Sequence, residues 1–123
     1  MKTVLVVEDN ADNLQIINYA LQRAGYKVIS AETGEKGVEL AIATCPSLIL
    51  MDINLPGIDG IETTRQIRAS EADGAVPIVA ITSYAMRGDR EKIMAAGCNG
   101  YFEKPFDPMT IVEQIHQILE LEK

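Results

Sequence analysis

Short apolar segments alternate along the chain with longer segments in which apolar residues recur every three or four positions. The short apolar segments predict strands at residues 3–7, 27–31, 48–51, 78–81 and 100–102. The segments between and after them have helical periodicity, near residues 11–24, 34–43, 60–70, 86–96 and 108–121. Strict alternation of strands and helices is typical of a parallel sheet with helices on both faces. The pattern therefore predicts a single α/β domain of five βα units.

Residues that favour helix ends stand at the expected boundaries. Gly25 and Gly97 lie where two helices should stop, and Asp107 precedes a proline at the expected start of the last helix. Asp59, followed three residues later by Glu62, fits the start of the third helix. We therefore interpret Asp59 as a helix cap and not as a chemical group.

Three carboxylates stand directly after predicted strands. Glu8 and Asp9 follow the first strand, and Asp52 follows the third. Because parallel strands all point the same way, these acids should meet at one edge of the sheet, where open α/β sheets bind their ligands. Carboxylates this close together repel each other unless a cation joins them, and Mg²⁺ is the cation that we expect. A purely structural role for Glu8 and Asp9 would be to cap the first helix, which Asn10 can do instead.

Composition and charge narrow the class of protein. The chain has 123 residues, of which 47% are hydrophobic and 24% charged, as is ordinary for one folded domain. No apolar run approaches the roughly 18 residues of a membrane helix, and no basic and apolar leader is present, so a cytoplasmic protein is expected. The net charge of -7 argues against direct binding to nucleic acid.

Further polar residues follow the fourth and fifth predicted strands. Thr82-Ser83 ends the fourth strand, Lys104-Pro105 follows the fifth, and Asp52 begins the phrase Asp52-Ile-Asn-Leu-Pro-Gly-Ile-Asp-Gly60. Together with the acidic pair, and in this order, these motifs resemble the receiver domains of bacterial two-component response regulators. The resemblance is to the CheY-like, stand-alone type and covers the whole chain. Each motif is specific only in combination with the others.

The resemblance implies a fold and a domain organisation. The fold would be flavodoxin-like, a doubly wound parallel sheet of five strands in the order 2-1-3-4-5, and residues 1–123 would form one receiver domain with no output domain. On this order Cys45 and Cys98 precede strands that are not adjacent and lie roughly 10 Å apart, too far for a disulfide. We expect two free, buried thiols.

The resemblance also gives the motif residues roles. Asp52 would be the nucleophile that accepts a phosphoryl group, because an aspartate carboxylate can form a covalent phosphate. Asp9 and Asp52 would bind Mg²⁺ (or Mn²⁺) directly, the backbone carbonyl of Asn54 would be a further ligand, and Glu8 would act through water. The phosphoryl oxygens would contact three more residues, Thr82, Ser83 and Lys104, of which Thr82 and Lys104 would assist the reaction.

Two residues are candidates for signalling and partner binding. Tyr101 resembles the aromatic switch residue of the family, and we expect it to respond to movement of Thr82 toward the phosphate. Leu14, at the margin of the apolar stripe of the first helix, is either a docking residue or partly buried at the core edge. His116 lies among polar residues of the last helix, so we do not expect it to donate the phosphoryl group.

The implied function is a phosphorylation-driven switch in a two-component system or phosphorelay. Its partners would be a histidine kinase or a histidine phosphotransfer protein and a downstream protein target, and the chain would act as a monomer or weak dimer. Two alternatives stay open. One is a Mg²⁺-dependent phosphatase with an aspartate nucleophile, although such enzymes usually carry a second acid where this chain has Asn54. The other is a receiver-like interaction module that works without phosphorylation.

Overall fold

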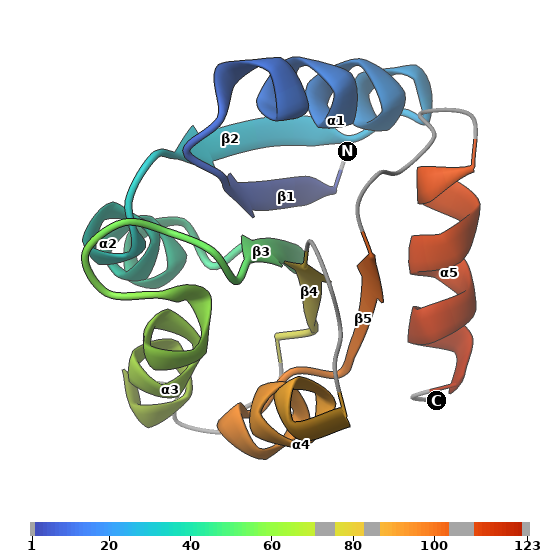
Figure 1. The fold of residues 1–123 in the computed structure, drawn as a ribbon. Coiled ribbons are helices and arrows are strands. Elements are labelled where there is room, and N and C mark those ends of the chain that lie inside the picture. Colours follow the sequence, from blue (N-terminus) through green and yellow to red (C-terminus); the bar gives the residue numbers. More distant parts are fainter. Residues whose placement is uncertain (1, 71–75, 83–86, 104–109, 122–123) are drawn as a thin grey trace.

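The computed structural model describes residues 2–70, 76–82, 87–103 and 110–121, except the side chains of residues 87–89 and 119–121. Within these ranges strands and helices alternate as predicted (Figure 1). The strands are β1 (Thr3–Val7), β2 (Lys27–Ala31), β3 (Leu48–Asp52), β4 (Ile78–Thr82) and β5 (Gly100–Glu103). The helices are α1 (Ala11–Arg23), α2 (Gly34–Thr44), α3 (Gly60–Ser70), α4 (Arg87–Ala96) and α5 (Ile111–Leu121).

The strands form one parallel sheet in the order β2-β1-β3-β4-β5, so the predicted fold class and strand order are confirmed. Three strands end one residue later than predicted, because Asp52 pairs with Ile81 and Thr82 pairs with Glu103 in the ladders. After β2 the chain passes β1 and continues at β3, which places the reversal of strand order between β1 and β3. This is the position at which open α/β sheets bind ligands.

Helices cover both faces of the sheet and bury two apolar layers (Figure 1). On one face Val4, Val6 and Leu50 pack with residues of α1 and α5, such as Leu21 and Ile115. On the opposite face alternate strand residues pack against α2, α3 and α4. The central strands β3 and β4 are buried along their whole length, as expected of strands that are covered on both sides. None of the helices within the described ranges is long and apolar enough to cross a membrane.

The expected helix ends are present where the structure describes them. Gly25 and Gly97 have φ angles of 92° and 117°, a backbone region that glycine adopts without strain. The Asp59 carboxylate accepts a hydrogen bond of 2.9 Å from the backbone N–H of Glu62, so Asp59 caps α3 as predicted. Asp107 lies outside the described residues.

The prediction of two buried thiols is wrong for Cys45. Both cysteines are free, but Cys45 is exposed, because it forms the left-handed C-cap of α2 with a φ of 46° and not a part of the core. Cys98 is buried. Desolvation raises the pKa of the Cys98 thiol, and a hydrogen bond with Thr64 and the nearby charge of Arg68 act in the opposite direction.

Arg68 joins α3 to the end of the sheet that lies opposite the acids. Its guanidinium donates hydrogen bonds of 2.8 and 3.0 Å to the carbonyl of Gly97, 2.7 Å to the carbonyl of Val76 and 2.9 Å to the side chain of Asn99. The same Asn99 oxygen accepts 2.8 Å from the N–H of Ile78. This network fixes the starts of β4 and β5, and so the two strands whose far ends complete the candidate site.

Candidate functional site

The site lies at the carboxyl edge of β1 and β3, the two neighbours between which the strand order reverses. In the ladder Val7 of β1 pairs with Met51 of β3, so the next residues, Glu8 and Asp52, stand side by side. The backbone N–H of Glu8 donates 2.9 Å to the carbonyl of Ala31, which ties the end of β1 to β2. Sheet pairing therefore sets the relative position of the two acids.

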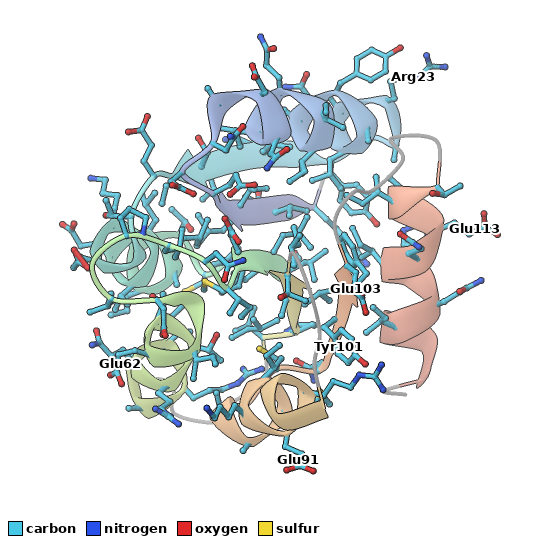
Figure 2. The ribbon with its side chains drawn as sticks, viewed as in Figure 1. Arg23, Glu62, Glu91, Tyr101, Glu103 and Glu113 are labelled. Carbon is cyan, nitrogen blue, oxygen red and sulfur yellow. The ribbon has the colours of Figure 1, made fainter. Side chains whose placement is uncertain are left out.

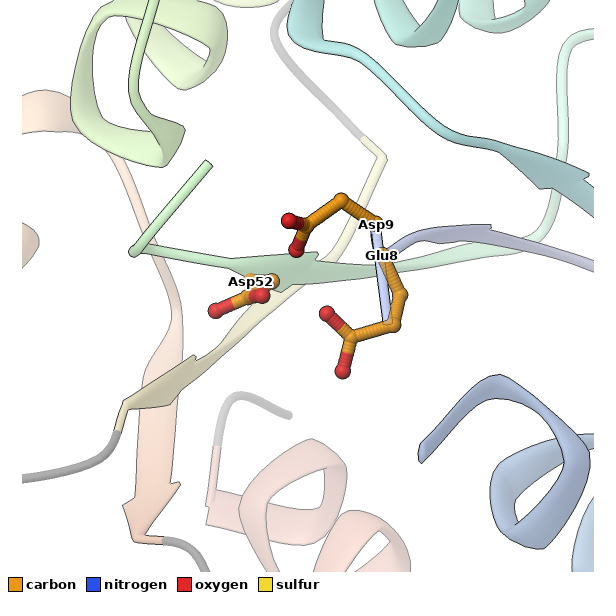
Figure 3. A group of neighbouring side chains, drawn as sticks. All are labelled: Glu8, Asp9 and Asp52. Carbon is orange, nitrogen blue, oxygen red and sulfur yellow. The ribbon is translucent and has the colours of Figure 1, made fainter. Parts of the chain in front are cut away.

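The three predicted carboxylates come together at this edge. One oxygen each from Glu8, Asp9 and Asp52 can be chosen so that all three lie within 4.8 Å of one another (Figure 3). The side chains of Glu8 and Asp52 are only 1% exposed, whereas Asp9 is exposed. Carboxylates held this close together repel each other, more strongly where they are buried, and a bound cation would offset that repulsion.

The donor set fits Mg²⁺. This ion takes about six oxygens at roughly 2.1 Å, so ligands on opposite sides of it lie about 4.2 Å apart. The 4.8 Å span of Glu8, Asp9 and Asp52 is close to that value and leaves room for a water between one acid and the ion. All three groups are oxygen donors, as Mg²⁺ requires, and no sulfur or nitrogen ligand lies among them.

The α1 helix begins without using the acids as its cap. The side chain of Asn10 accepts a hydrogen bond of 3.0 Å from the backbone N–H of Asn13. Asn10 is therefore the N-cap, and the alternative in which Asp9 performs this role is not needed. Asp9 precedes the helix and is left at the edge of the sheet with Asp52 (Figure 3).

The segment after β3 orients the Asp52 carboxylate. The backbone N–H of Asn54 donates 3.0 Å to Oδ1 of Asp52, and the N–H of Ile53 donates 3.0 Å to the carbonyl of Ile81. The second bond extends the pairing of β3 with β4 by one residue. Asn54 itself is exposed, in the loop that carries the predicted carbonyl ligand.

Thr82 is the last residue of β4 and is 3% exposed. Because Asp52 pairs with Ile81, Thr82 stands one residue beyond it on the neighbouring strand, at the same edge of the sheet. Ser83 follows Thr82 and Lys104 follows the end of β5 at Glu103, but both lie outside the described residues.

An open groove of about 580 Å³ begins beside Thr82 and runs between the loop after β3 and helices α3 and α4. Three apolar residues, two neutral polar residues, one acid and two cations line it: Ile53, Asn54, Leu55, Asp59, Ile61, Arg65, Thr82 and Lys92. The groove opens the carboxyl edge of β3 and β4 to solvent on one side of the molecule. No local sequence pattern predicts this groove, because its wall is assembled from four separate elements.

The candidate switch residue, Tyr101, and the candidate docking residue, Leu14, are both half-buried. Tyr101, in β5 (Figure 2), is half-buried on the face of the sheet that α4 covers. The guanidinium carbon of Arg90 lies 5.8 Å from the centre of the Tyr101 ring. Leu14 is half-buried and packs against the core, which agrees with the alternative that this residue is partly buried at the core edge. His116 is exposed and shares a hydrogen bond of 2.7 Å with Tyr26.

Two residues that contact the candidate residues were not predicted from the sequence. Gly60, the first residue of α3, lies against the backbone of Asp52, and Arg90 of α4 lies over the ring of Tyr101. A glycine directly after a capping acid can indicate that another segment packs closely against it, but the sequence does not identify that segment. The pairing of Arg90 with Tyr101 joins separate elements and has no local signal.

Comparison with known proteins finds matches over almost the whole chain. Residues 4–116 match the family model of the response regulator receiver domain. The polar-differentiation response regulator DivK of Brucella ovis is 36% identical over 118 residues, which cover 96% of each chain. The chemotaxis response regulator CheY4 of Vibrio cholerae superposes with a TM-score of 0.90 at 28% identity, covering 96% of this chain and 98% of that one.

A further solved structure bears on the acids. It is the receiver domain of the sensor histidine kinase PA1611 from Pseudomonas aeruginosa PAO1, with a magnesium ion coordinated in its active site cleft. This domain is 38% identical, with a TM-score of 0.86, and the match covers 97% of this chain and 98% of that one.

Proposed function

This chain belongs to the response regulator receiver domain family, the phosphorylation-activated switches of two-component signalling, and we propose that Asp52 is its phosphoacceptor. One observation carries the proposal. Asp52 ends a central strand with its carboxylate buried, and the carboxylates of Glu8 and Asp9 lie within 4.8 Å of it. Asp52 is the member of this cluster that also lies beside Thr82 on the neighbouring strand.

Glu8, Asp9 and Asp52 would hold Mg²⁺ or Mn²⁺, with the backbone carbonyl of Asn54 as a further ligand. The proposal rests on the fit of the oxygen cluster and on the magnesium ion of the PA1611 receiver domain. Asp9 and Asp52 would bind directly and Glu8 through water. The bound ion would neutralise charge on the phosphoryl oxygens during transfer.

Asp52 would take the phosphoryl group from a phosphohistidine of the partner. A carboxylate oxygen of Asp52 forms the new bond to phosphorus as the bond from phosphorus to the imidazole nitrogen breaks, and that nitrogen keeps the electron pair. The hydrogen bond from the N–H of Asn54 to Oδ1 holds the carboxylate in one orientation before the attack. Thr82, Ser83 and Lys104 would donate to the phosphoryl oxygens.

Tyr101 would convert phosphorylation into a changed surface. Movement of Thr82 toward the phosphate would free space on the side of β4 that faces β5, and the half-buried Tyr101 ring would turn into it. Arg90 would oppose this turn, because a guanidinium over an aromatic ring is stabilised by roughly 0.5–1 kcal/mol at an exposed site. Equal partner affinity for Tyr101→Ala and wild type, each with and without phosphate, would remove this hypothesis.

The proposed setting is a cytoplasmic two-component pathway. The partners would be a histidine kinase or histidine phosphotransfer protein and a downstream target protein, with no direct role for nucleic acid or membrane. Leu14 would contribute to docking only through its exposed part. The chain would act as a monomer or weak dimer and would catalyse its own phosphorylation and slow dephosphorylation, without turning over a separate substrate.

The direct test is the intact mass after incubation with a small acyl-phosphate donor, with and without Mg²⁺. We expect wild type to gain one phosphoryl group only with Mg²⁺, Asp52→Ala to gain none, and the control Asp59→Asn to behave as wild type because Asp59 caps α3. Steady release of phosphate from small phosphate esters would favour the phosphatase alternative. A wild type that neither gains mass nor is stabilised by Mg²⁺ would favour the interaction module.

A further inference from the structure

We propose that Gly60 is a positioning residue for the phosphoacceptor, because no side chain fits between the start of α3 and the backbone of Asp52. A Cβ built on Gly60 would collide with the carbonyl oxygen of Asp52 and would lie 2.7 Å from Cα of Ile53 and 3.0 Å from the carbonyl carbon of Asp52. All three are backbone atoms, so no rotamer change can relieve the contact. The inference rests on the proposed role of Asp52.

Gly60 closes the loop that orients the site. Its backbone N–H donates 3.0 Å to the carbonyl of Ile53, so residues 54–59 form a loop that is closed at its base. At one end of this loop the N–H of Asn54 holds Oδ1 of Asp52, and at the other end Gly60 touches the Asp52 backbone. The carboxylate, the proposed carbonyl ligand of Asn54 and the start of α3 are thus linked within a few residues.

Space, and not backbone conformation, is the reason for glycine at this position. Gly60 is not among the described glycines with positive φ, which are Gly25, Gly57 and Gly97. Alanine could therefore adopt the same helical backbone and would favour the helix by up to about 1 kcal/mol. The close approach to Asp52 is the feature that alanine cannot reproduce.

A side chain at position 60 should displace the loop and not the helix. The first turns of α3 are held by the fully buried Thr63 and Thr64, whose hydroxyls donate 2.7 and 2.8 Å to backbone carbonyls, and by the Asp59 cap. The segment after Asp52 is more exposed, at Asn54, Pro56 and Gly57. A shift there moves Asn54 relative to the carboxylate, and a misplacement of about 1 Å at a reacting centre can cost roughly 100-fold in rate.

The test compares Gly60→Ala with Gly100→Ala. A Cβ at Gly100 would lie 2.5 Å from Cγ2 of Ile118, so this control also introduces a short contact, but with a side chain that can move and at the start of β5, far from the acids. The Mg²⁺ dissociation constant is measured by calorimetry and the phosphorylation rate with an acyl-phosphate donor. We expect Gly60→Ala to bind Mg²⁺ at least about 10-fold more weakly and to react about 10- to 100-fold more slowly, with Gly100→Ala unchanged in both.

Wild-type values in folded Gly60→Ala would overturn the inference while leaving the role of Asp52 intact. If the wild type itself neither binds Mg²⁺ nor accepts a phosphoryl group, the proposed function fails instead. The two failures are therefore distinguishable.

Hydrogen exchange on the wild type keeps the test decisive if Gly60→Ala does not fold. If loop closure and Mg²⁺ binding are coupled, the open loop binds Mg²⁺ poorly. Exchange of the Gly60 amide should then slow by about 100-fold when the Mg²⁺ concentration is 100 times the dissociation constant. The Gly97 amide, bonded to the carbonyl of Met94 at the opposite end of the sheet, is the control and should not change. An equal response of both amides, or no response of Gly60, would contradict the proposal.

Discussion

Asp9→Asn should stabilise the metal-free protein and strongly reduce its stabilisation by Mg²⁺. Asp9 contributes one of three carboxylates whose oxygens lie within 4.8 Å of one another, and Glu8 and Asp52 are both buried. The amide keeps the shape of the side chain and removes its charge. The change therefore tests the electrostatics of the cluster without opening a cavity.

The separation of the acids sets the magnitude. Two unit charges 4.8 Å apart repel by about 0.9 kcal/mol in water and about 3.5 kcal/mol at an effective dielectric constant of 20. Asp9 is exposed, so the lower figure applies to each of its two pairs, and salt screens it further. We expect Asp9→Asn to raise the free energy of unfolding by about 1 kcal/mol at low salt in the presence of a chelator.

Denaturant unfolding with a chelator and with Mg²⁺ checks the prediction. Wild type should gain about 2.7 kcal/mol when Mg²⁺ is at 100 times its dissociation constant, and Asp9→Asn should gain much less. Asp12→Asn is the matched control, because Asp12 lies in the first turn of α1 and favours the helix dipole. Its removal should slightly destabilise the protein and leave the Mg²⁺ effect intact.

The contrary result would be an Asp9→Asn protein that is no more stable than wild type without Mg²⁺ and gains as much from Mg²⁺ as wild type does. That result would mean that the three carboxylates do not share a cation. A gain in stability for Asp12→Asn equal to that for Asp9→Asn would instead trace the effect to the net charge of -7.

Further predictions concern the scaffold. Arg68→Met should lower the free energy of unfolding by about 2–4 kcal/mol, because several charged hydrogen bonds to backbone carbonyls are lost. Arg65→Met, the control, should change the free energy of unfolding by less than about 0.5 kcal/mol. Equal effects of the two substitutions in denaturant titrations would contradict this prediction. A thiol reagent should label exposed Cys45 in the native protein and buried Cys98 only after unfolding, as seen by intact mass. The pKa of the Cys98 thiol is raised in the folded state, so the neutral thiol contributes to the free energy of unfolding. This contribution should be complete at pH values below the ordinary thiol pKa of 9.0 and should be lost as the pH rises above 9.0. A Cys98→Ala variant that loses the same stability over this pH range would contradict the prediction. Asp59→Ala should cost about 1 kcal/mol through loss of the α3 cap, and an unchanged melting midpoint would refute it.

The sequence was sufficient for the fold and for the acids because both depend on local patterns. Apolar runs define the strands, and the direction of a parallel sheet brings Glu8, Asp9 and Asp52 to one edge. The cap by Asp59 likewise follows from the residues next to it. Cys45 was misjudged because hydrophobicity alone does not tell whether a cysteine that precedes a strand belongs to the core or to a helix end.

Contacts between separate elements could not be predicted in the same way. The Arg68 network, the position of Arg90 over Tyr101 and the contact of Gly60 with Asp52 each depend on how α3 or α4 packs against the sheet. The helical pattern gives the buried face of a helix, but not its position along the sheet to within an ångström. These contacts decide how rigidly the predicted acids are held.

The proposed phosphorylation of Asp52 can be tested by locating the modified residue directly. Borohydride reduces an aspartyl phosphate to homoserine, so reduction of the phosphorylated protein followed by peptide mass spectrometry identifies the modified residue. We expect homoserine at position 52 only, formed only when Mg²⁺ and the acyl-phosphate donor are both present. Homoserine at Asp9 or Asp59, or none in protein that has gained a phosphoryl group, would contradict it.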